Sequence, residues 1–419
     1  MKKYETYKDS GLEWLGMVPE HWGIVPLKYL LSEPLQYGAN ESADNCNPSE
    51  PRYIRITDIT EDGKLRKSTY RTLPYQKAEG YMLKKGDILF ARSGATVGKT
   101  FIFEEDYDAC FAGYLIKASC NEKLLPMFLY YFTSSNSYEN WKNSTFNQAT
   151  IQNIGADKYC TLPIPTPSSE EQEGIINFLS HNVAQIDALI SEKEKMVEDL
   201  KAYRSSLITE TVTKGLDKDV KMKDSGVEWI GKMPQNWKLL KLKRIINLKS
   251  GTSLTSDRIL DEGKYQVFGG NGPRGYIDDY TNEGNFVLIG RQGALCGNIN
   301  YANGKFWATE HAIICYPLKE IDTIWLGETL RAMNLNQYSI SAAQPELAVE
   351  RINELLIPTP SISEQKEISS YLKLKITQIE SAISEQEHQL SDLKSYKSSL
   401  ITEAVTGKID LRDWQTKKS

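Results

Sequence analysis

Two stretches of closely similar sequence, LPIPTPSSEEQ at 162–172 and LLIPTPSISEQ at 355–365, decide how this chain is built. The similarity runs on without a gap from 162–217 to 355–410, where 29 of 56 aligned residues are identical. A repeat of this length indicates that one supersecondary unit occurs twice. The fold must therefore contain two copies of whatever structure these residues form.

A second repeat precedes each copy of the first. KDSGLEWLGMVPEHW at 8–22 returns as KDSGVEWIGKMPQNW at 223–237, a shift of 215 positions against 193 for the first repeat. The two halves therefore differ in length by 22 residues between these anchors, and most of the similarity disappears there. We predict two like scaffolds that carry two unlike inserts. The predicted domains are residues 1–160, 161–216, 217–354 and 355–419.

Each copy of the first repeat has the pattern of one long helix. Ile-Pro-x-Pro cannot lie inside a helix, and a capping box follows it, formed by Ser168 and Glu171 in the first copy. Apolar residues then recur in alternate steps of four and three, which is typical of a coiled-coil seam. Glycines at 215 and 407 end the two runs. The residues expected at the helix interface are Leu179, Ile186, Ile190, Leu200, Leu372, Ile379, Ile383 and Leu393.

A long helix with one narrow apolar seam needs a partner, and its own twin is available in the same chain. The two helices can pair parallel or antiparallel. Antiparallel pairing places Leu179 nearer to Leu400 than to Leu372 and relates the inserts by a pseudo-twofold axis. Such symmetry suits DNA with two spaced half-sites. A coiled coil between two separate chains is the alternative.

Composition narrows the class of protein. No apolar run approaches 18 residues and the chain starts with polar residues, so we expect a cytoplasmic protein without a membrane partner. The six cysteines form no Cys-x-x-Cys pair and the four histidines are far apart, so we expect reduced thiols and no metal site. The net charge of −5 arises within residues 168–217, so it does not exclude a basic face elsewhere.

One island of similarity survives inside the inserts, ILFARSGATVGKT at 88–100 and VLIGRQGALCGNI at 287–299. The first copy is similar to a phosphate-binding loop, but it is one residue short and strand-like residues follow it instead of a helix. Both copies keep a strand, Arg-x-Gly and a second glycine, which we interpret as a tight strand connection. A DNA contact by the arginines is the functional alternative. The candidate DNA-binding residues here are Arg92, Ser93, Lys99, Arg291 and Gln292.

Three further patterns resemble catalytic or binding motifs. FGGNG at 268–272 fits a loose methyl-donor loop, but the companion Pro-Pro motif is impossible because the chain has no Pro-Pro dipeptide. In a glycine-rich turn instead, Asn271 and Arg274 can reach base edges, since Asn pairs with adenine and Arg with guanine. DGK at 62–64 and EGK at 262–264 lack the additional carboxylates of a nuclease and are typical of turns. The amides upstream of the helices, Asn147, Gln148 and Gln344, are further candidates for DNA contacts.

In their order and doubling, these motifs resemble the specificity subunit of type I restriction-modification enzymes over nearly the whole chain. The motifs are YKDSGLEWLGMVPEHW, IPTPSSEEQ and SSLITETVTKGLD, with their second copies VKMKDSGVEWIGKMPQNW, IPTPSISEQ and SSLITEAVTGKIDLR. The resemblance implies an α+β fold with two globular target recognition domains, residues 1–160 and 217–354. A pair of long antiparallel helices, forming a coiled coil with an internal pseudo-twofold repeat, is expected to separate them.

The resemblance also implies a function. The chain is expected to be a non-catalytic subunit that binds double-stranded DNA and reads a bipartite sequence, one half per recognition domain. Its expected partners are two methyltransferase subunits and restriction subunits that translocate and cut DNA. No cofactor or metal is expected on this chain, whereas S-adenosylmethionine, ATP and Mg²⁺ are expected to serve the partners. A stand-alone adenine-specific DNA methyltransferase and a coiled-coil scaffold without a DNA role are the alternatives.

Overall fold

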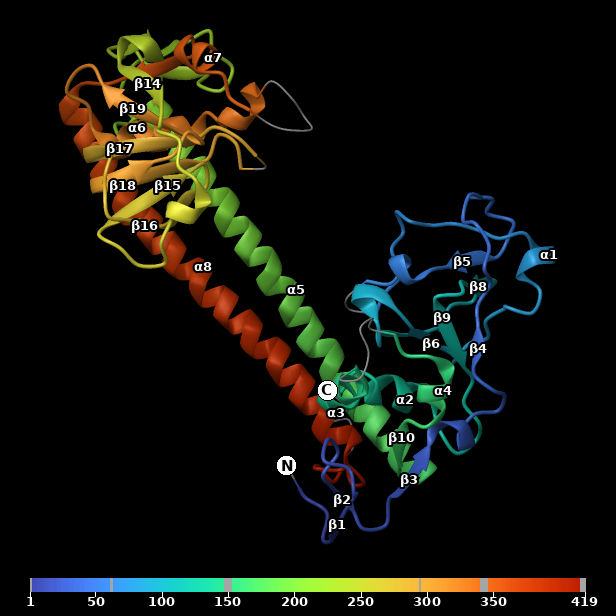
Figure 1. Cartoon of the computed structure of the whole chain (residues 1–419). Coiled ribbons are helices and arrows are strands. Elements are labelled where there is room, and N and C mark those ends of the chain that lie inside the picture. Colours follow the sequence, from blue (N-terminus) through green and yellow to red (C-terminus); the bar gives the residue numbers. More distant parts are fainter. Residues whose placement is uncertain (1, 61–62, 147–152, 294, 340–345, 415–419) are drawn as a thin grey trace. The chain divides into compact units, whose positions relative to one another are not determined.

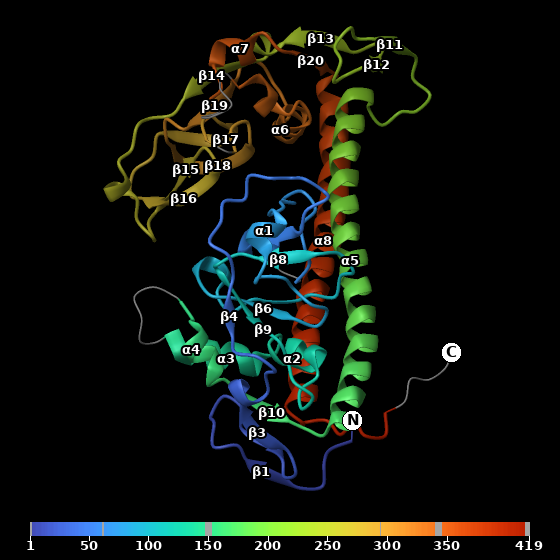
Figure 2. The same ribbon diagram turned by 90° about the vertical axis from the view of Figure 1, so that its right-hand side faces the viewer.

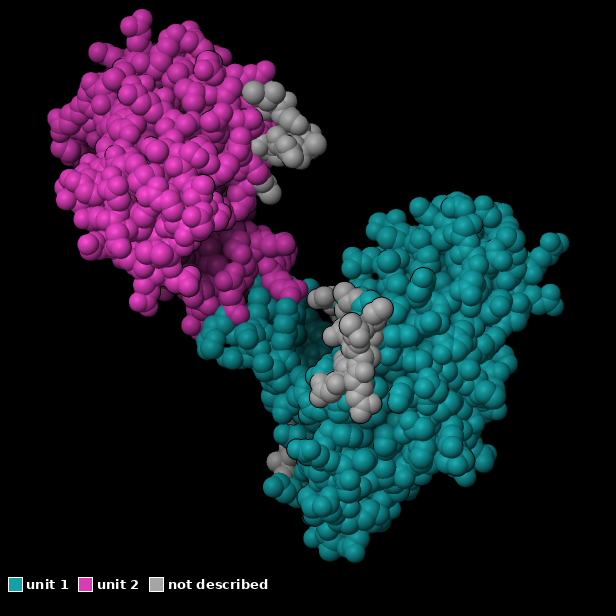
Figure 3. Space-filling view, viewed as in Figure 1, with its two compact units in different colours: residues 1–193, 388–419 teal, residues 194–387 magenta. Residues whose placement is uncertain are grey.

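The computed structural model describes residues 2–60, 63–146, 153–293, 295–339 and 346–414. The chain forms two compact units, shown in teal and magenta in Figure 3. Unit 1 consists of residues 1–193 and 388–419, and unit 2 of residues 194–387. Each unit therefore contains one insert together with part of both repeated helical segments.

The repeated segments form two long helices, α5 (Ser169–Lys214) and α8 (Ile362–Val405), which Figure 1 draws in green and red. Both begin at the expected capping box. Ser168 Oγ accepts the Glu171 N–H at 3.3 Å, and Glu171 Oε2 accepts the Ser168 N–H at 3.3 Å. Their counterparts in the second copy make the same two bonds at 3.0 and 3.3 Å. The two orphaned donors at each helix start are thus satisfied.

A glycine with a positive φ ends each helix and packs against a tryptophan. A Cβ on Gly215 (φ 77°) would lie 3.0 Å from the Trp237 ring, and a Cβ on Gly407 (φ 69°) would lie 3.1 Å from the Trp22 ring. Both the left-handed conformation and the close approach favour glycine. Within unit 1, α8 from the second copy therefore ends against the N-terminal repeat of the first copy.

The two helices pair antiparallel in each unit, as expected (Figure 2). In unit 1 the start of α5 packs on the end of α8, and Leu179 shares an apolar cluster with Leu400. In unit 2 the end of α5 packs on the start of α8, and Val212 shares a cluster with Leu372. Among the eight residues expected at the interface, the structure buries Leu179, Ile186, Leu372, Ile379 and Ile383, and half-buries Ile190, Leu200 and Leu393.

Ion pairs between the helices follow the internal repeat. Lys397 Nζ lies 2.6 Å from Asp187 Oδ1 in unit 1, and Arg204 lies 3.2 Å from Glu380 in unit 2. A shift of 193 positions relates Asp187 to Glu380 and Arg204 to Lys397. The same interaction thus occurs twice, with the roles of the two helices exchanged.

The insert of unit 1 is an α+β body around an antiparallel sheet in the order β4-β9-β6-β7. These strands are Gln36–Tyr37, Leu115–Ala118, Ile88–Ala91 and Thr100–Ile102. The other strands are the parallel pair β5 (Arg52–Ile54) and β8 (Ala109–Phe111), and the antiparallel pairs β1 (Tyr7–Asp9) with β2 (Met17–Pro19) and β3 (Gly23–Pro26) with β10 (Pro163–Thr166). The short helices are α1 (Tyr75–Ala78), α2 (Pro126–Phe132), α3 (Asn136–Phe146) and α4 (Ala156–Cys160).

The insert of unit 2 is built around a six-stranded mixed sheet in the order β14-β19-β17-β18-β15-β16. These strands are Ile246–Ser250, Ala312–Pro317, Asn282–Gly290, Ile299–Ala308, Tyr265–Gly269 and Gly272–Ile277. Two antiparallel pairs repeat those of unit 1, β11 (Met222–Asp224) with β12 (Lys232–Pro234) and β13 (Lys238–Lys241) with β20 (Leu356–Thr359). The short helices are α6 (Thr323–Ala332) and α7 (Val349–Asn353).

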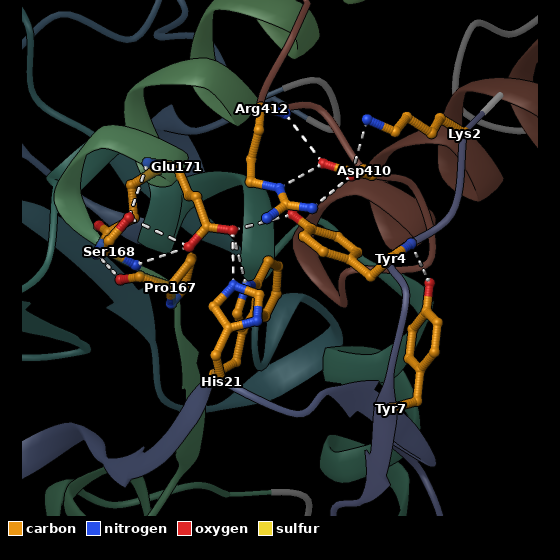
Figure 4. A network of polar contacts seen from close by, with 11 residues as sticks. Lys2, Tyr4, Tyr7, His21, Pro167, Ser168, Glu171, Asp410 and Arg412 are labelled. Carbon is orange, nitrogen blue, oxygen red and sulfur yellow. Dashed lines mark hydrogen bonds and ion pairs between the residues drawn. The ribbon is translucent and has the colours of Figure 1, made fainter.

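A polar network joins both ends of the chain to the start of α5 in unit 1 (Figure 4). The Asp410 N–H donates to the Lys2 carbonyl at 2.9 Å, and Arg412 donates two bonds to the Asp410 carboxylate at 2.9 and 2.8 Å. The Arg412 guanidinium lies 5.0 Å from the ring centre of Tyr4, whose hydroxyl donates to Glu171 at 3.3 Å. The segment after α8 is thereby held against the N-terminal residues.

Glu171 is the buried carboxylate of this network. It accepts hydrogen bonds from the Trp22 indole at 3.4 Å and from His21 at 2.9 Å. Burial raises the pKa of Glu171, but the bonds from His21 and Trp22 outweigh burial and hold that pKa below its ordinary value. In unit 2 the Trp237 indole donates to Glu364 at 3.0 Å in the same way.

Candidate nucleic-acid interface

The Arg-x-Gly motif forms the same turn in both units. Strands β6 and β17 are buried over their last four residues, and each leads directly into the arginine. In unit 1 the Gly98 N–H donates to the Ala91 carbonyl at 2.8 Å, and in unit 2 the Gly297 N–H donates to the Gly290 carbonyl at 2.7 Å. Gly98 (φ 82°) and Gly297 (φ 86°) are both left-handed. The motif is therefore the tight strand connection that the sequence indicated.

This geometry excludes a phosphate-binding loop. Such a loop must open a helix, whose N-terminal amides hold the phosphate. In unit 1 the turn holds only a short 3-10 segment, Gly94–Thr96, and the chain then enters strand β7 at Thr100. RSGATVGKT resembles an ATPase motif because the strand connection also requires closely spaced glycines.

Each arginine of the motif holds two neighbouring segments through its backbone. The Arg92 N–H donates to the Tyr114 carbonyl at 3.0 Å, and the Arg92 carbonyl accepts the Ile154 N–H at 2.9 Å. In unit 2 the Arg291 N–H donates to the His311 carbonyl at 2.8 Å, and the Arg291 carbonyl accepts the Leu347 N–H at 2.9 Å. We call this arrangement the backbone cross. It joins three chain segments in the same way in both inserts.

The two guanidinium groups share one feature and differ in another. The Nε atoms of Arg92 and Arg291 are both buried without a hydrogen-bond partner among the described residues. The Arg92 guanidinium lies 4.9 Å from the ring centre of Tyr37, whereas Arg291 pairs with Glu346 at 2.9 Å and donates to Ser250 Oγ at 3.3 Å. A buried N–H without an acceptor costs about 1–3 kcal/mol, so a movement of the side chain that brought Nε to an acceptor on a ligand would recover this cost.

In unit 2 the structure brings the glycine-rich turn next to the arginine. A Cβ on Gly270 would lie 3.0 Å from the His311 carbonyl oxygen and 3.8 Å from the Arg291 nitrogen. The adjacent Asn271 is exposed and accepts a hydrogen bond from the Asn298 side chain at 3.1 Å. Asn271 and Arg291, far apart in the sequence, thus flank one surface. The F-x-G-x-G pattern is a turn between β15 and β16.

The other unit 2 candidates, Arg274 and Gln292, are both exposed. Arg274 is exposed on β16, and its side chain covers Gly269, where a Cβ would lie 2.5 Å from Arg274 Cδ. Gln292 is exposed directly after Arg291, and its amide nitrogen donates to Glu346 at 3.0 Å.

In unit 1 the candidates separate. Ser93 follows Arg92 directly and forms a β-bridge with Asn153. Lys99 instead lines a cavity of about 510 Å³, whose walls include Asp187 and Lys397 of the helix pair. Only Arg92 and Ser93 therefore share the backbone cross. The remaining candidates, Asn147, Gln148 and Gln344, lie outside the described residues.

Sequence reasoning missed the residues at the other end of the backbone cross. Tyr114 is 62% exposed, and the side chain of His311 is 42% exposed. Both lie three residues after the buried end of a strand, which is Phe111 in β8 and Ala308 in β18. Their surrounding sequences, ACFAGY and FWATEH, share too little for an alignment to pair them.

The described residues hold no group of three His, Cys, Asp or Glu side chains that could bind a metal ion. All six cysteines are free. Among the helices in the described part of the chain, none is long and apolar enough to cross a membrane.

The internal repeat and the Arg-x-Gly turn together define a class of protein. In this class one backbone framework occurs twice in the chain and presents different polar side chains in each copy. The chain belongs to the family of the type I restriction modification DNA specificity domain, whose model matches residues 36–199 and again residues 234–388. It thus carries two DNA specificity domains of the type I kind, and the methyltransferase alternative is not favoured.

Similar proteins agree with this membership. The specificity subunit of the type I restriction enzyme EcoprrI of Escherichia coli is 29% identical over 327 residues, which cover 76% of this chain and 79% of the relative. The specificity subunit of the MjaVIII enzyme of Methanocaldococcus jannaschii is 23% identical over 98% and 97% of the two chains. A chain of a type I R-M system, solved to study complex assembly and conformational transition, has the same fold with a TM-score of 0.74, 17% identity and coverage of 94% and 99%.

Proposed function

We propose that each unit of this chain reads one half of a bipartite sequence in double-stranded DNA, and that Arg92 and Arg291 contact the DNA. The observation that carries the proposal is the repeat of an arginine with an unpaired, buried Nε on one common backbone cross. The inserts share little else in sequence. An arginine that both inserts share is therefore suited to a contact that both half-sites offer. The residues around it differ between the inserts and are suited to reading different bases.

The chemistry of arginine supports this assignment. A guanidinium presents five donors in a planar fork, which matches a phosphate group or the edge of guanine. Glu346 holds one side of the Arg291 fork at 2.9 Å, so DNA must compete with this carboxylate in unit 2. The Arg92 guanidinium lies over the ring of Tyr37 instead, and it pairs with no carboxylate among the described residues of unit 1. We expect the two arginines to differ in what they contribute.

An exchange of inserts tests the two-reader proposal. Residues 23–160 are replaced by the matching insert of a relative with a different target, and methylated adenines in the host genome are mapped. One half of the methylated motif should change while the other half and the assembly persist. The matched control replaces the unit 2 insert, residues 238–354, and should change the opposite half. If both halves changed in either chimaera, the two-reader proposal would be wrong.

The partners are part of the same proposal. The chain would dock two methyltransferase subunits and, through them or beside them, restriction subunits that translocate and cut DNA. Large apolar side chains stay exposed on α5 at seven-residue intervals, namely Leu189 at 46%, Met196 at 41% and Tyr203 at 56%. A seven-residue interval forms a second seam on a helix that already has one. This second seam is suited to a partner helix.

Substituting the second seam tests the docking proposal. Met196→Glu should remove adenine methylation in the host and the co-purification of the methyltransferase subunit. DNA binding by the chain should persist, because the substitution lies outside both inserts. The control is Glu198→Gln, at another exposed position of the same helix that lies off the seam. Normal methylation in Met196→Glu would place the docking site elsewhere.

We also propose that this chain is non-catalytic and binds no cofactor of its own, in the cytoplasm. S-adenosylmethionine would bind to the methyltransferase partners, and ATP and Mg²⁺ would serve the restriction partners. Equilibrium dialysis of the purified chain with labelled S-adenosylmethionine should give no retention. Retention at one molecule per chain would instead support a stand-alone adenine methyltransferase.

A further inference from the structure

The backbone cross pairs two residues that the sequence does not align. In unit 1 the arginine N–H meets the carbonyl of Tyr114, and in unit 2 it meets the carbonyl of His311. These residues therefore occupy the same place on the common framework. Their side chains differ in size, polarity and hydrogen-bonding capacity.

A second contact gives the same correspondence independently. A Cβ on Gly38 would lie 2.4 Å from the carbonyl oxygens of Phe111 and Ala112, and a Cβ on Gly251 would lie 2.2 and 2.4 Å from those of Ala308 and Thr309. Both glycines thus mark one close crossing of two strands. Phe111 in unit 1 therefore corresponds to Ala308 in unit 2. Three residues later, Tyr114 corresponds to His311.

The side chain at this place in unit 2 is oriented by a hydrogen-bond relay. Glu346 accepts from the amide nitrogen of Gln292 at 3.0 Å, so the amide oxygen of Gln292 faces His311 Nδ1 at 2.9 Å. An amide oxygen can only accept, so Nδ1 of His311 carries the proton. In the neutral ring, Nε2 is then an acceptor, and the Glu310 carboxylate lies 3.7 Å from it, beyond hydrogen-bonding distance.

The corresponding side chain in unit 1 is not held by such a relay among the residues that the structure describes. Tyr114 is one of the most exposed large side chains of the chain, at 62%. Its backbone is held by the cross and by the Gly113 N–H, which donates to the Ala39 carbonyl at 2.8 Å. The phenol therefore projects from a rigid base. At this place a ligand can reach the phenol without any movement of the backbone.

We propose that Tyr114 and His311 are the matched base-reading residues of the two units, each discriminating a base pair in a different half of the DNA target. This proposal rests on the proposed function and adds to it the residues that set specificity. The Nε2 atom of His311 can accept from an exocyclic amino group in the major groove. The Tyr114 phenol can donate, accept or contact a thymine methyl group.

The test is a binding selection with the full-length chain, purified with the subunits that it retains, on duplexes with a randomised centre. Wild type should enrich a bipartite motif. Tyr114→Ala should lose a preference of about tenfold or more at one position in one half, and His311→Ala should lose a similar preference in the other half. Total binding to the unselected pool should change by less than about twofold, since base readers add little to non-specific binding.

Matched controls separate base reading from general damage. Tyr29→Ala removes a phenol of equal exposure, 61%, and His388→Ala removes an exposed imidazole from α8. Both should leave every position of the motif unchanged. Thermal unfolding of all four variants should match wild type, because none of the four side chains is buried. Gln292→Ala, which breaks the relay, should weaken the same position as His311→Ala.

The outcomes separate this proposal from the function on which it rests. A wild-type chain that enriches no sequence overturns both. A wild-type motif that stays intact in Tyr114→Ala and His311→Ala overturns the base-reading proposal and leaves the two-reader function standing. Loss at positions within the same half also overturns it, because the structure places the two residues in different units.

Discussion

Residue by residue, the framework of this protein is most constrained where backbone groups meet backbone groups. The two arginines keep their place because N–H and C=O both pair with neighbouring segments, whatever the side chain does. Their guanidinium groups are then free to differ, with an aromatic ring beneath Arg92 and a carboxylate beside Arg291. The function that we propose therefore depends on side chains that the backbone framework does not itself require.

This distinction predicts the effect of removing the arginines. Arg92→Ala and Arg291→Ala should each weaken DNA binding without unfolding the chain. If the arginine contacts a phosphate, the slope of log K against log salt should fall by about one unit for every sequence. If it contacts a base, discrimination worth about 1–3 kcal/mol should vanish at one position. Arg244→Ala, at an exposed arginine, serves as the control, and a lowered melting temperature with unchanged binding would make these arginines framework residues.

Two glycines of one turn allow a sharper test of the framework. Gly293 (φ 89°) has open space where a Cβ would stand, whereas a Cβ on Gly297 (φ 86°) would lie 2.7 Å from the backbone nitrogen of Asn336. Gly293→Ala should therefore lower the free energy of unfolding by about 1–2 kcal/mol through backbone strain alone. Gly297→Ala should cost a further 1–3 kcal/mol, roughly, since the strand connection must move. Equal losses in a denaturant titration would show that this contact relaxes freely.

At the scale of elements, the helices are stabilised at their ends as much as along their seam. Each begins at a capping box, ends at a left-handed glycine and carries a carboxylate that a tryptophan indole holds. In unit 1 this carboxylate also connects to the two chain ends through Tyr4 and Arg412. The end of α5 continues covalently into the second N-terminal repeat, residues 223–237. The end of α8 is held by non-covalent contacts against the first N-terminal repeat, near the start of the chain.

This network predicts a pH dependence of stability. The pKa of Glu171 is held below its ordinary value by His21 and Trp22 despite burial, and hydrogen bonds from Arg412 lower the pKa of Asp410. A depressed carboxyl pKa contributes stability above the ordinary value, about 4, and that contribution is lost as the pH falls through the folded-state pKa. The melting temperature of Glu171→Gln should therefore lie below wild type at pH 7 and converge with it below about pH 4.

Glu364→Gln is the matched control for this network, because Glu364 occupies the same place in unit 2 without the chain ends. The pKa of Glu364 is also below its ordinary value, since hydrogen bonds from Ser361 and Trp237 outweigh the effect of burial. We expect the same convergence with a smaller difference at pH 7. A Glu171→Gln deficit that stayed constant from pH 7 to pH 3 would show that the charge of Glu171 is not what stabilises the network.

For the molecule as a whole, the helices are the parts that both units share. Both unit boundaries fall within α5 or α8, so a change in helix length acts on both units at once. The repeated ion pairs, Asp187 with Lys397 and Arg204 with Glu380, occur at one register of the two helices. An insertion that keeps the 3.5-residue seam in phase must therefore enter both helices together.

Lengthening both helices by one heptad tests whether they set the spacing of the DNA target. Seven residues add roughly 10 Å of helix at 1.5 Å per residue. The unread spacer between the two half-sites should lengthen by about three base pairs at 3.4 Å each. A heptad also leaves a rotation of about 20° on a straight helix, so partial loss of activity is expected. A variant that still methylates the original spacing would show that the helix pair is not the ruler.

Much of this architecture could be read from the sequence because it depends on local chemistry. The capping boxes, the terminal glycines and the seam of α5 and α8 follow from residues a few positions apart, and the doubling follows from identity at a constant shift. The Arg-x-Gly turn was also recognisable, since left-handed glycines leave a local signature. Tyr114 and His311 were not, because nothing in ACFAGY and FWATEH pairs them.

The sequence by itself determined the repeat, the two long helices with their ends, the turn that carries the arginines and the family. Only the tertiary structure decided the direction of helix pairing, since one apolar seam fits a parallel or an antiparallel twin until opposite helix ends pack in one core, as Leu179 does with Leu400. It alone also placed Asn271 beside Arg291 and matched Tyr114 with His311. The match of Tyr114 with His311 is made by backbone hydrogen bonds between distant segments, and the residue type does not show which backbone group its own will meet.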